Sequence, residues 1–342
     1  MKRCTSNQSF IVSKRSLIIS IQCLLASIAF AADEKPKEPA AKKPELPTYT
    51  TAAEGGQDFI DQGEYKNDWG GAQVIALGND NFRMVSYRGG LPGEGWDKEY
   101  KQEVNGKRDP ANKSLITFTS TNNYRAELVA GKITITSDAG GPWTMEKVTR
   151  HSSTEGAKPP TGAIVLFDGS NTDAWKGAHI DDRKLLASGA STKAQFTNYS
   201  MHCEFLLPFK PLGRGQDRGN SGVYMQDRYE VQVLDSFGLK GENNECGGIY
   251  SQIKPSVNMC YPPLTWQTYD IDFQAARFDD AGKKTKNAII TVKHNGVTIH
   301  DHVEIKGPTG GGKKEDPNGG SVQLQGHGNP VFYRNVWIVP KA

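Results

Sequence analysis

The stretch RGNSGVYMQDRYEVQVLDS, residues 218–236, decides the fold of the second half of the chain. Two runs of alternating apolar and polar residues flank a short polar turn, which is typical of a β-hairpin. If Gln226 faces Glu230 and Tyr224 faces Gln232, apolar side chains gather on one face and polar ones on the other. We therefore expect the apolar face to cover a core and the polar face to present tyrosine, amide and carboxylate groups, which suit sugar hydroxyls.

The position of Asp235 raises a separate question, because it lies five residues beyond Glu230 and a regular strand would turn it to the apolar face. A β-bulge near Val233–Leu234 would return it to the polar face, and bulges are common beside active sites. The spacing Glu-x-Gln-x-x-Asp is similar to the Glu-x-Asp-x-x-Glu strand of laminarinase-type glucanases, which are jelly-roll sandwiches. Retaining glycosidases use two carboxylates about 5–5.5 Å apart. Because Gln232 replaces the central carboxylate, the glucanase mechanism is not carried over, and a solvated polar face is the alternative.

The rest of the chain predicts an all-β protein in two blocks. Residues 49–150 form an accessory β-meander of short strands, with turns at Asn79–Asn81 and Gly131–Lys132. Residues 151–162 are a Pro-containing linker. Residues 163–342 contain evenly spaced strands and the hairpin turn His294–Gly296, which together favour a two-sheet sandwich with one sheet curved enough to hold a ligand.

The N-terminus predicts export. Basic residues precede the apolar run SLIISIQCLLASIAF, and small residues at 29 and 31 complete a secretory signal peptide over residues 1–31. A transmembrane anchor is the alternative, although such a helix needs about 20 apolar residues; a lipoprotein at Cys23 is a weaker one. Residues 32–48 are rich in Lys, Glu, Pro and Ala and are predicted to be a linker. We expect a periplasmic or extracellular protein with no membrane span after signal removal.

Three cysteines follow the signal peptide. In an oxidising compartment, Cys246 and Cys260 are predicted to form a disulfide across a Gly- and Pro-containing loop, which would stabilise the fold by about 3 kcal/mol. Cys203 alternates with apolar residues and is expected to be a buried thiol. The sequence contains no CxxC pair, so a thiolate zinc site is not expected.

The net charge does not favour nucleic acid as a partner. The chain has 342 residues, with 41 Lys and Arg against 38 Asp and Glu, which gives a formal charge of +3. A nearly neutral chain gives no electrostatic reason to expect nucleic acid as a partner.

Several motifs of the second block resemble one known family. In order they are RGNSGVYMQDRYEVQVLDS, CGGIYSQ, WQTYDIDF, VKHNGVTI, GPTGG and LQGHGNPVFYRNVWI. Together they resemble the 3-keto-disaccharide hydrolase family, whose fold is similar to the concanavalin A-like lectin/glucanase sandwich. The resemblance covers residues 163–340, and the first block lies outside it. It implies action on glycosides already oxidised at C3 of one sugar, and we expect another protein, an oxidoreductase, to carry out that oxidation.

A ketone at C3 makes the C2 proton acidic, so a base can remove it to form an enolate. The C1 leaving group then departs by β-elimination, and water added to the enone completes net hydrolysis. Such a site needs a general base, an acid for the leaving group and a group that stabilises the enolate. Glu230 and Asp235 are candidates for acid and base, and His327 is a second proton carrier. Direct displacement at C1 by the two carboxylates is the alternative.

The enolate has three candidate stabilisers: Arg218, Arg334, or a divalent metal held by carboxylate, imidazole and amide oxygens, with Glu230 and His327 among its ligands. Other candidate substrate-binding residues come from the polar face, the aromatic residues and the last motif; they are Asn220, Tyr224, Gln226, Gln232, Tyr250, Trp266 and Gln325. Tyr250 and Trp266 are candidates for stacking on a sugar ring, although aromatic residues of sandwiches more often belong to the core.

A second function stays open, because the same fold hosts lectins and fold does not determine function. A non-catalytic carbohydrate-binding module is the alternative to the enzyme. Acidic residues on the polar face favour the enzyme, since amides and aromatics suffice to bind a neutral sugar. A third reading is an extracellular scaffold whose first block binds the envelope or another partner.

Overall fold

The computed structural model describes residues 45–120, 124–138 and 140–341. The predicted signal peptide, and residues 32–44 of the predicted linker, lie outside the described residues. The described chain contains only one six-residue α-helix, α1 (Gly56–Asp61), and one 3-10 turn, η1 (Gly215–Asp217), and is otherwise built from β-strands. The all-β prediction is confirmed. Within the same ranges, no helix is long and apolar enough to cross a membrane.

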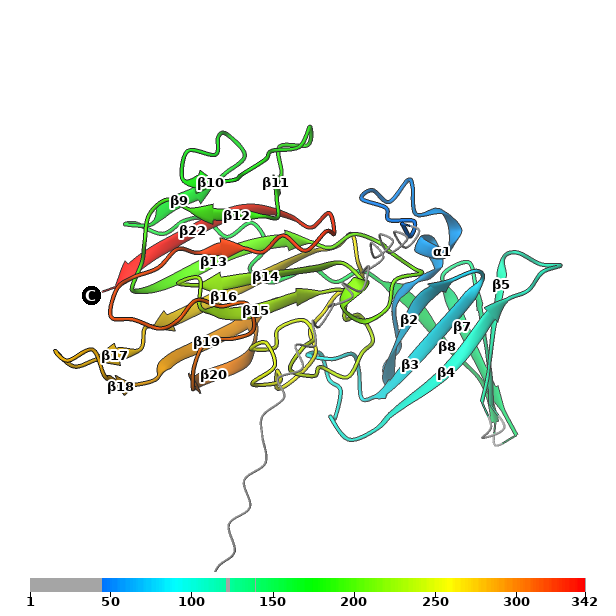
Figure 1. Cartoon of the computed structure of the whole chain (residues 1–342). Helices are drawn as coiled ribbons and strands as arrows, with labels where there is room; N and C mark the ends of the chain where they lie inside the picture. The colour runs from blue at the N-terminus through cyan, green and yellow to red at the C-terminus, as the bar shows by residue number, and fades with distance from the viewer. Residues whose placement is uncertain (1–44, 121–123, 139, 342) are drawn as a thin grey trace, which may run out of the picture. The chain divides into compact units, whose positions relative to one another are not determined.

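The first block is a closed antiparallel barrel in which each strand pairs with the next and β1 pairs with β8 (Figure 1). Its strands are β1 (Gly63–Lys66), β2 (Gly70–Gly78), β3 (Asn81–Arg88), β4 (Lys101–Arg108), β5 (Leu115–Thr119), β6 (Tyr124–Val129), β7 (Lys132–Ser137) and β8 (Gly140–Val148). Closure leaves no free edge in this sheet. The predicted meander is therefore a barrel, which the strand pattern alone did not show.

The turns of the barrel follow from residues that accept positive φ. The β2–β3 turn uses Asn79 and Asp80 at φ 54° and 61°, at the predicted place. The β6–β7 turn uses Ala130 and Gly131, one residue earlier than predicted. The barrel interior is filled by apolar side chains such as Phe82, which packs with other residues from most of its strands.

The second block contains two main antiparallel sheets. The five-stranded sheet has the order β10 (Trp175–Lys176), β12 (Ala190–Thr192), β21 (Gln323–Leu324), β14 (Asn220–Met225), β15 (Tyr229–Leu234). The second sheet has the order β11 (Leu186–Ala187), β22 (Phe332–Lys341), β13 (Asn198–Leu206), β16 (Trp266–Gln274), β19 (Ala288–His294), β20 (Val297–Ile305), and β9 (Ile164–Phe167) also pairs with β22. β17 (Arg277–Phe278) and β18 (Lys284–Lys286) form a small separate ribbon.

The core of this block lies between the two sheets. Val223 and Val231 of the five-stranded sheet belong to the same buried cluster as Phe205 and Ile271 of the other sheet. The β19–β20 turn uses Asn295 and Gly296 at φ 51° and 82°, as predicted. The predicted two-sheet sandwich is confirmed. One face of the β14–β15 hairpin packs in its core, and the other face points away from the core.

The barrel and the sandwich are joined by buried contacts. Phe209, which follows β13, is fully buried in the hydrophobic cluster of the barrel and packs on Tyr49 and Phe59, with ring centroids 5.9 Å and 5.5 Å away. Backbone hydrogen bonds of 2.9 Å link Phe209 and Tyr49 in both directions. The Arg218 guanidinium also donates to the carbonyl of Ala76 in β2 (3.3 Å). Phe209, which belongs to the sandwich part of the sequence, is therefore part of the hydrophobic core of the barrel.

The predicted disulfide is not formed. Cys246 and Cys260 are buried free thiols in this structure. The two thiols are close enough to share a hydrogen bond. Cys246 Sγ also lies 3.2 Å from the hydroxyl of Tyr269, and Cys260 Sγ donates to the carbonyl of Leu234 (3.5 Å). The spacing of the two cysteines in the sequence did not reveal these partners. Cys203 is a buried thiol, as expected, and burial raises its pKa.

We expect Phe209→Ala to reduce the free energy of unfolding by about 3–5 kcal/mol, because it leaves a cavity in the barrel cluster. Urea unfolding followed by tryptophan fluorescence would measure the change. Val165→Ala is the control, since Val165 is 45% exposed and its truncation should cost less than about 0.5 kcal/mol. Equal midpoints for the two variants would contradict the shared core.

Candidate functional site

The β14–β15 hairpin has the predicted faces but not the predicted register. Tyr224 pairs with Glu230, and Gly222 pairs with Gln232. The loop takes residues 226–228, and Gln226 and Asp227 both have φ 56°. The register therefore differs by two residues, which keeps every side chain on its predicted face because side chains alternate with a period of two. Polar residues remain on the face away from the core.

Gln226 is consequently not part of the polar face. It lies in the turn, where its side-chain amide donates to the carbonyl of Phe196 (3.0 Å) and accepts from Arg228 (3.0 Å). The prediction that Gln226 binds substrate on the polar face is therefore wrong. The turn is longer than predicted and removes Gln226 from the paired strand.

Glu230 lies at the centre of the polar face and is 2% exposed. Its Oε2 accepts a hydrogen bond from the hydroxyl of Tyr224 (2.8 Å). Its backbone is held on both sides, because its N–H donates to Thr309 Oγ1 (2.9 Å) and its carbonyl accepts from Tyr250 (3.1 Å). Gly222 supplies the space for the carboxylate, since a Cβ at that position would lie 2.0 Å from Glu230 Oε1.

The carboxylate of Glu230 has no ion-pair partner in the described ranges of the chain. Burial raises its pKa to about 7, and the hydrogen bond from Tyr224 opposes this rise. A carboxyl group with this pKa exchanges its proton near neutral pH, which is the property required of a general acid or base.

The side-chain amide of Gln232 lies next to the carboxylate of Glu230. With its nitrogen toward Glu230, Nε2 donates to Glu230 Oε1 (3.0 Å) and to the carbonyl of Ser221 (2.9 Å). This orientation gives the nitrogen two acceptors, whereas the opposite one turns the amide oxygen toward them. Gln232 is therefore a neutral hydrogen-bond donor to Glu230.

Loops cover this face and leave a pocket of about 240 Å³. Its lining is mostly amide and backbone groups with one tyrosine and one histidine: Gln216, Asn220, Glu230, Gln232, Tyr250, Gly310, Gly311, Gln325 and His327. Tyr224 lies behind Glu230, and its hydroxyl contacts the carbonyl of Gly310 (2.7 Å) and the amide of Gln325 (3.3 Å). The pocket is thus an acid in a ring of neutral hydrogen-bonding groups.

Comparison with protein families assigns this half of the chain. Residues 162–339, about half the sequence, match the 3-keto-alpha-glucoside-1,2-lyase-like domain. This chain belongs to that family. The family resemblance read from the motifs of the second block is therefore confirmed.

Comparisons with solved structures and with curated proteins give less information than the family match. Two structures of proteins from Parabacteroides distasonis ATCC 8503, both described as candidate glycosyl hydrolases, are similar to this chain. One has 34% identity, covers 53% of this chain and 85% of its own, with a TM-score of 0.49. The other has 17% identity, covers 57% and 98%, with a TM-score of 0.39. A search of curated proteins found no match.

Two predicted site residues of the lyase-like domain lie elsewhere as an ion pair. Asp235 Oδ2 accepts from Arg218 Nε (2.7 Å), and both side chains are buried. No register shift interrupts the β14–β15 pairing, so Asp235 stays on the side away from Glu230 and does not line its pocket. The predicted bulge is absent, so the prediction that Glu230 and Asp235 share one site is wrong.

Arg334 and Trp266 also lie outside the pocket. Arg334 binds Glu204 (2.7 Å) and Glu155 (2.8 Å), and its guanidinium lies 3.9 Å from the centroid of the Trp266 ring. These residues belong to the second sheet, whereas Glu230 is on the five-stranded sheet. Arg334 is held by two acidic side chains, which gives it a structural role. Trp266 packs against Arg334 outside the pocket, so it is not placed to stack on a sugar bound there.

The pocket of the lyase-like domain contains one carboxylate and one imidazole, Glu230 and His327. Residues 45–120, 124–138 and 140–341 contain no cluster of three or more His, Cys, Asp or Glu side chains suited to a metal. A divalent ion at this pocket would need amide oxygens, such as those of Asn220 and Gln232, and water to complete its ligands.

Sequence reasoning missed Gln216, Gly310, Gly311 and Gly222. The first three come from loops that reach the pocket only in the folded chain. Gly222 had a signal in the sequence, since a glycine inside a strand often marks a close approach by another group. Here that group is the carboxylate of Glu230.

We expect Glu230→Gln to stabilise the protein above pH 7 by roughly 1–3 kcal/mol. The folded pKa of Glu230 is raised from the ordinary 4.5 to about 7, so stability falls as the pH rises from 4.5 to about 7 and the loss is complete above that, and Gln removes it. Unfolding midpoints at pH 4 and pH 8 would measure it. The exposed Glu146→Gln is the control. An equal effect of Glu230→Gln at both pH values would contradict the raised pKa.

We expect Asp235→Asn to reduce the free energy of unfolding by about 3 kcal/mol or more, because it leaves the buried charge of Arg218 without a carboxylate. Chemical unfolding would measure the loss. In the double variant Arg218→Met/Asp235→Leu, which removes both charges, much of the stability should return. A double variant less stable than Asp235→Asn would show that the ion pair is not the reason.

Proposed function

We propose that this protein is a glycoside-cleaving enzyme that acts on 3-keto-glycosides through elimination. One observation carries the proposal: Glu230 is a buried carboxyl group with a pKa of about 7 at the centre of a sugar-sized pocket lined by amides. Membership of the 3-keto-alpha-glucoside-1,2-lyase-like family supports the class of substrate. A pocket that only binds a neutral sugar gains nothing from burying an acid at this cost.

The chemistry assigns Glu230 to the first step. Its carboxylate removes the proton from C2, and the C2–H electron pair moves into a C2=C3 bond as the ketone becomes an enolate. Nε2 of Gln232 donates to Oε1 of Glu230 and so holds the carboxylate in position for this step. The amide donors of the pocket hold the enolate oxygen, since both candidate arginines lie in ion pairs outside it.

The second step breaks the C1–O bond. The enolate returns to a ketone, a C1=C2 double bond forms, and the departing oxygen takes a proton. His327 lines the pocket and is exposed, so it can exchange protons with solvent and supply this one. Addition of water, with hydroxide to C1 and a proton to C2, then converts the enone to the free 3-keto sugar.

The decisive experiment compares a 3-keto-glucoside with its unoxidised parent, with and without EDTA. We expect release of the aglycone and transient enone absorbance from the keto substrate alone. Glu230→Gln should lower kcat by about 10²–10⁴-fold, the usual contribution of a general base. Cleavage of the parent at a similar rate would overturn elimination in favour of ordinary glycosidase chemistry. Binding of both sugars without turnover would overturn the enzyme in favour of a carbohydrate-binding module.

We also propose that the enzyme is exported, on the basis of the signal-like sequence of residues 1–31. Its substrate is then made outside the cytoplasm, or delivered there, by an oxidoreductase that forms the ketone. N-terminal sequencing of the protein recovered from a periplasmic or culture fraction should begin at Ala32. Recovery of the intact N-terminus from the cytoplasm would overturn the proposal.

We expect Gly222→Ala to reduce kcat/KM by about 100-fold, because the new methyl group displaces the carboxylate of Glu230 and a shift of about 1 Å is enough for such a loss. The matched control is Gly307→Ala, where a Cβ meets no atom within 4 Å and φ is not positive. Rates on the 3-keto-glucoside would compare them. Equal rates for the two variants would show that the place of Glu230 does not depend on Gly222.

A further inference from the structure

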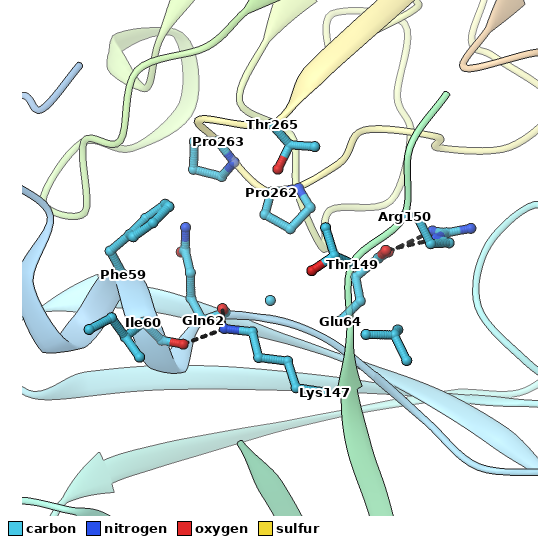
Figure 2. A pocket seen from close by; sticks show the side chains of 12 residues that line it. Phe59, Ile60, Gln62, Glu64, Lys147, Thr149, Arg150, Pro262, Pro263 and Thr265 are labelled. Carbon is cyan, nitrogen blue, oxygen red and sulfur yellow. Dashed lines mark hydrogen bonds and ion pairs between the residues drawn. The ribbon is translucent and has the colours of Figure 1, made fainter. Parts of the chain in front are cut away.

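A second cavity lies away from Glu230, between the barrel strands β1 and β8 and the loop before β16 (Figure 2). Its volume is about 280 Å³, near the lower end of the roughly 300–1,000 Å³ of small-molecule sites. This size fits one small molecule rather than a chain. None of its lining residues lines the Glu230 pocket.

An unpartnered amide points into this cavity. Gln62 is 2% exposed, and its Oε1 accepts a hydrogen bond from the backbone N–H of Ala76 (3.3 Å), which fixes the orientation of the amide. Its Nε2 is buried and has no hydrogen-bond partner among the described residues. Figure 2 shows this nitrogen directed toward Pro263 across the cavity. A buried donor without a partner is unfavourable, so it indicates a position where a ligand acceptor belongs.

A cation lies beside Gln62 (Figure 2). The ammonium of Lys147 donates to the carbonyls of Ile60 and Gln62, the latter at 2.7 Å, which leaves one of its three protons for another acceptor. Gly63 allows this approach, since a Cβ there would lie 2.8 Å from Lys147 Cε. The nearby carboxylate of Glu64 does not neutralise the ammonium, because it is already paired with Arg150 (2.6 Å).

The remaining walls are apolar or hydroxylated. The ring of Phe59 and the prolines Pro262 and Pro263 form flat apolar surfaces, and Thr149 and Thr265 add hydroxyl groups (Figure 2). Flat apolar walls suit the face of a sugar ring, whereas amide, ammonium and hydroxyl donors suit a carboxylate and its neighbouring hydroxyls. The unpartnered nitrogen of Gln62 and the ammonium of Lys147 both donate, so an oxygen-rich anion complements them.

We propose that this cavity is a second ligand site, for a monosaccharide-sized sugar acid such as a hexuronate. Its carboxylate bridges Gln62 Nε2 and Lys147 Nζ, and its ring lies against Phe59 and Pro262. The proposal does not depend on the chemistry at Glu230, and it gives the barrel, which lies outside the family match, a direct part in ligand binding.

The test measures binding of glucuronate, glucose and inorganic phosphate to the purified protein by calorimetry and saturation-transfer NMR at constant ionic strength. Glucuronate should bind, and glucose and phosphate should each bind at least about tenfold more weakly, because each lacks one half of the recognition. Equal binding of phosphate would overturn the sugar component, equal binding of glucose would overturn the anion component, and absence of glucuronate binding would overturn the site.

Two variants locate the binding. Gln62→Glu keeps an acceptor for Ala76 and replaces the free nitrogen by an oxygen, and Lys147→Met removes the charge while keeping the aliphatic stem. Each should weaken glucuronate binding by about tenfold or more. Lys132→Met, on the neighbouring strand β7, is the charge-matched control, and Glu230→Gln separates the two pockets; both should bind glucuronate as the wild type does. Unchanged binding in Gln62→Glu and Lys147→Met, with thermal unfolding confirming that both are folded, would overturn the proposal, as would loss of binding in Glu230→Gln.

Discussion

The burial of the Glu230 carboxylate without a cationic partner is the constraint on which the site depends. A lone buried acid is costly, and the structure reduces the cost with neutral groups, namely the hydroxyl of Tyr224 and the amide of Gln232. These groups leave the pKa of Glu230 near 7, where an arginine in their place would keep the carboxyl ionised. The opposite face of the same hairpin is packed in the sandwich core, which holds the backbone in position.

Three arginines outside the Glu230 pocket bind other carboxylates: Arg218 binds Asp235, Arg334 binds Glu204, and Arg150 binds Glu64. The first of these pairs also joins the sandwich to the barrel through the carbonyl of Ala76. Lys147 differs, because carbonyl groups hold its ammonium. The described chain therefore has an acidic pocket lined by amides and a separate cationic cavity with apolar walls.

Parts of this arrangement could be predicted because they depend on local chemistry. Asn295–Gly296 and Asn79–Asp80 accept positive φ, so their turns were predictable, and the alternation in residues 218–236 indicated both faces of the hairpin. The register was wrong by two residues because Gln226 and Asp227 occupy a turn whose length the pattern does not encode. Asp235 was misplaced because its partner, Arg218, is 17 residues away in the sequence.

The all-β class and the family of residues 162–339 could be read from the sequence, since strand alternation and motif order are properties of the chain itself. The same alternation indicated Glu230 as a candidate. Other features came only from the folded chain: the first block closes into a barrel, Cys246 and Cys260 are neighbouring free thiols, and Arg334 and Trp266 lie on the other sheet. The tertiary structure also determines which loops cover Glu230 and which residues surround Gln62. The physical reason is that burial, and with it the pKa of a carboxyl group or the cost of an unpaired amide, depends on residues distant in sequence that only folding brings together.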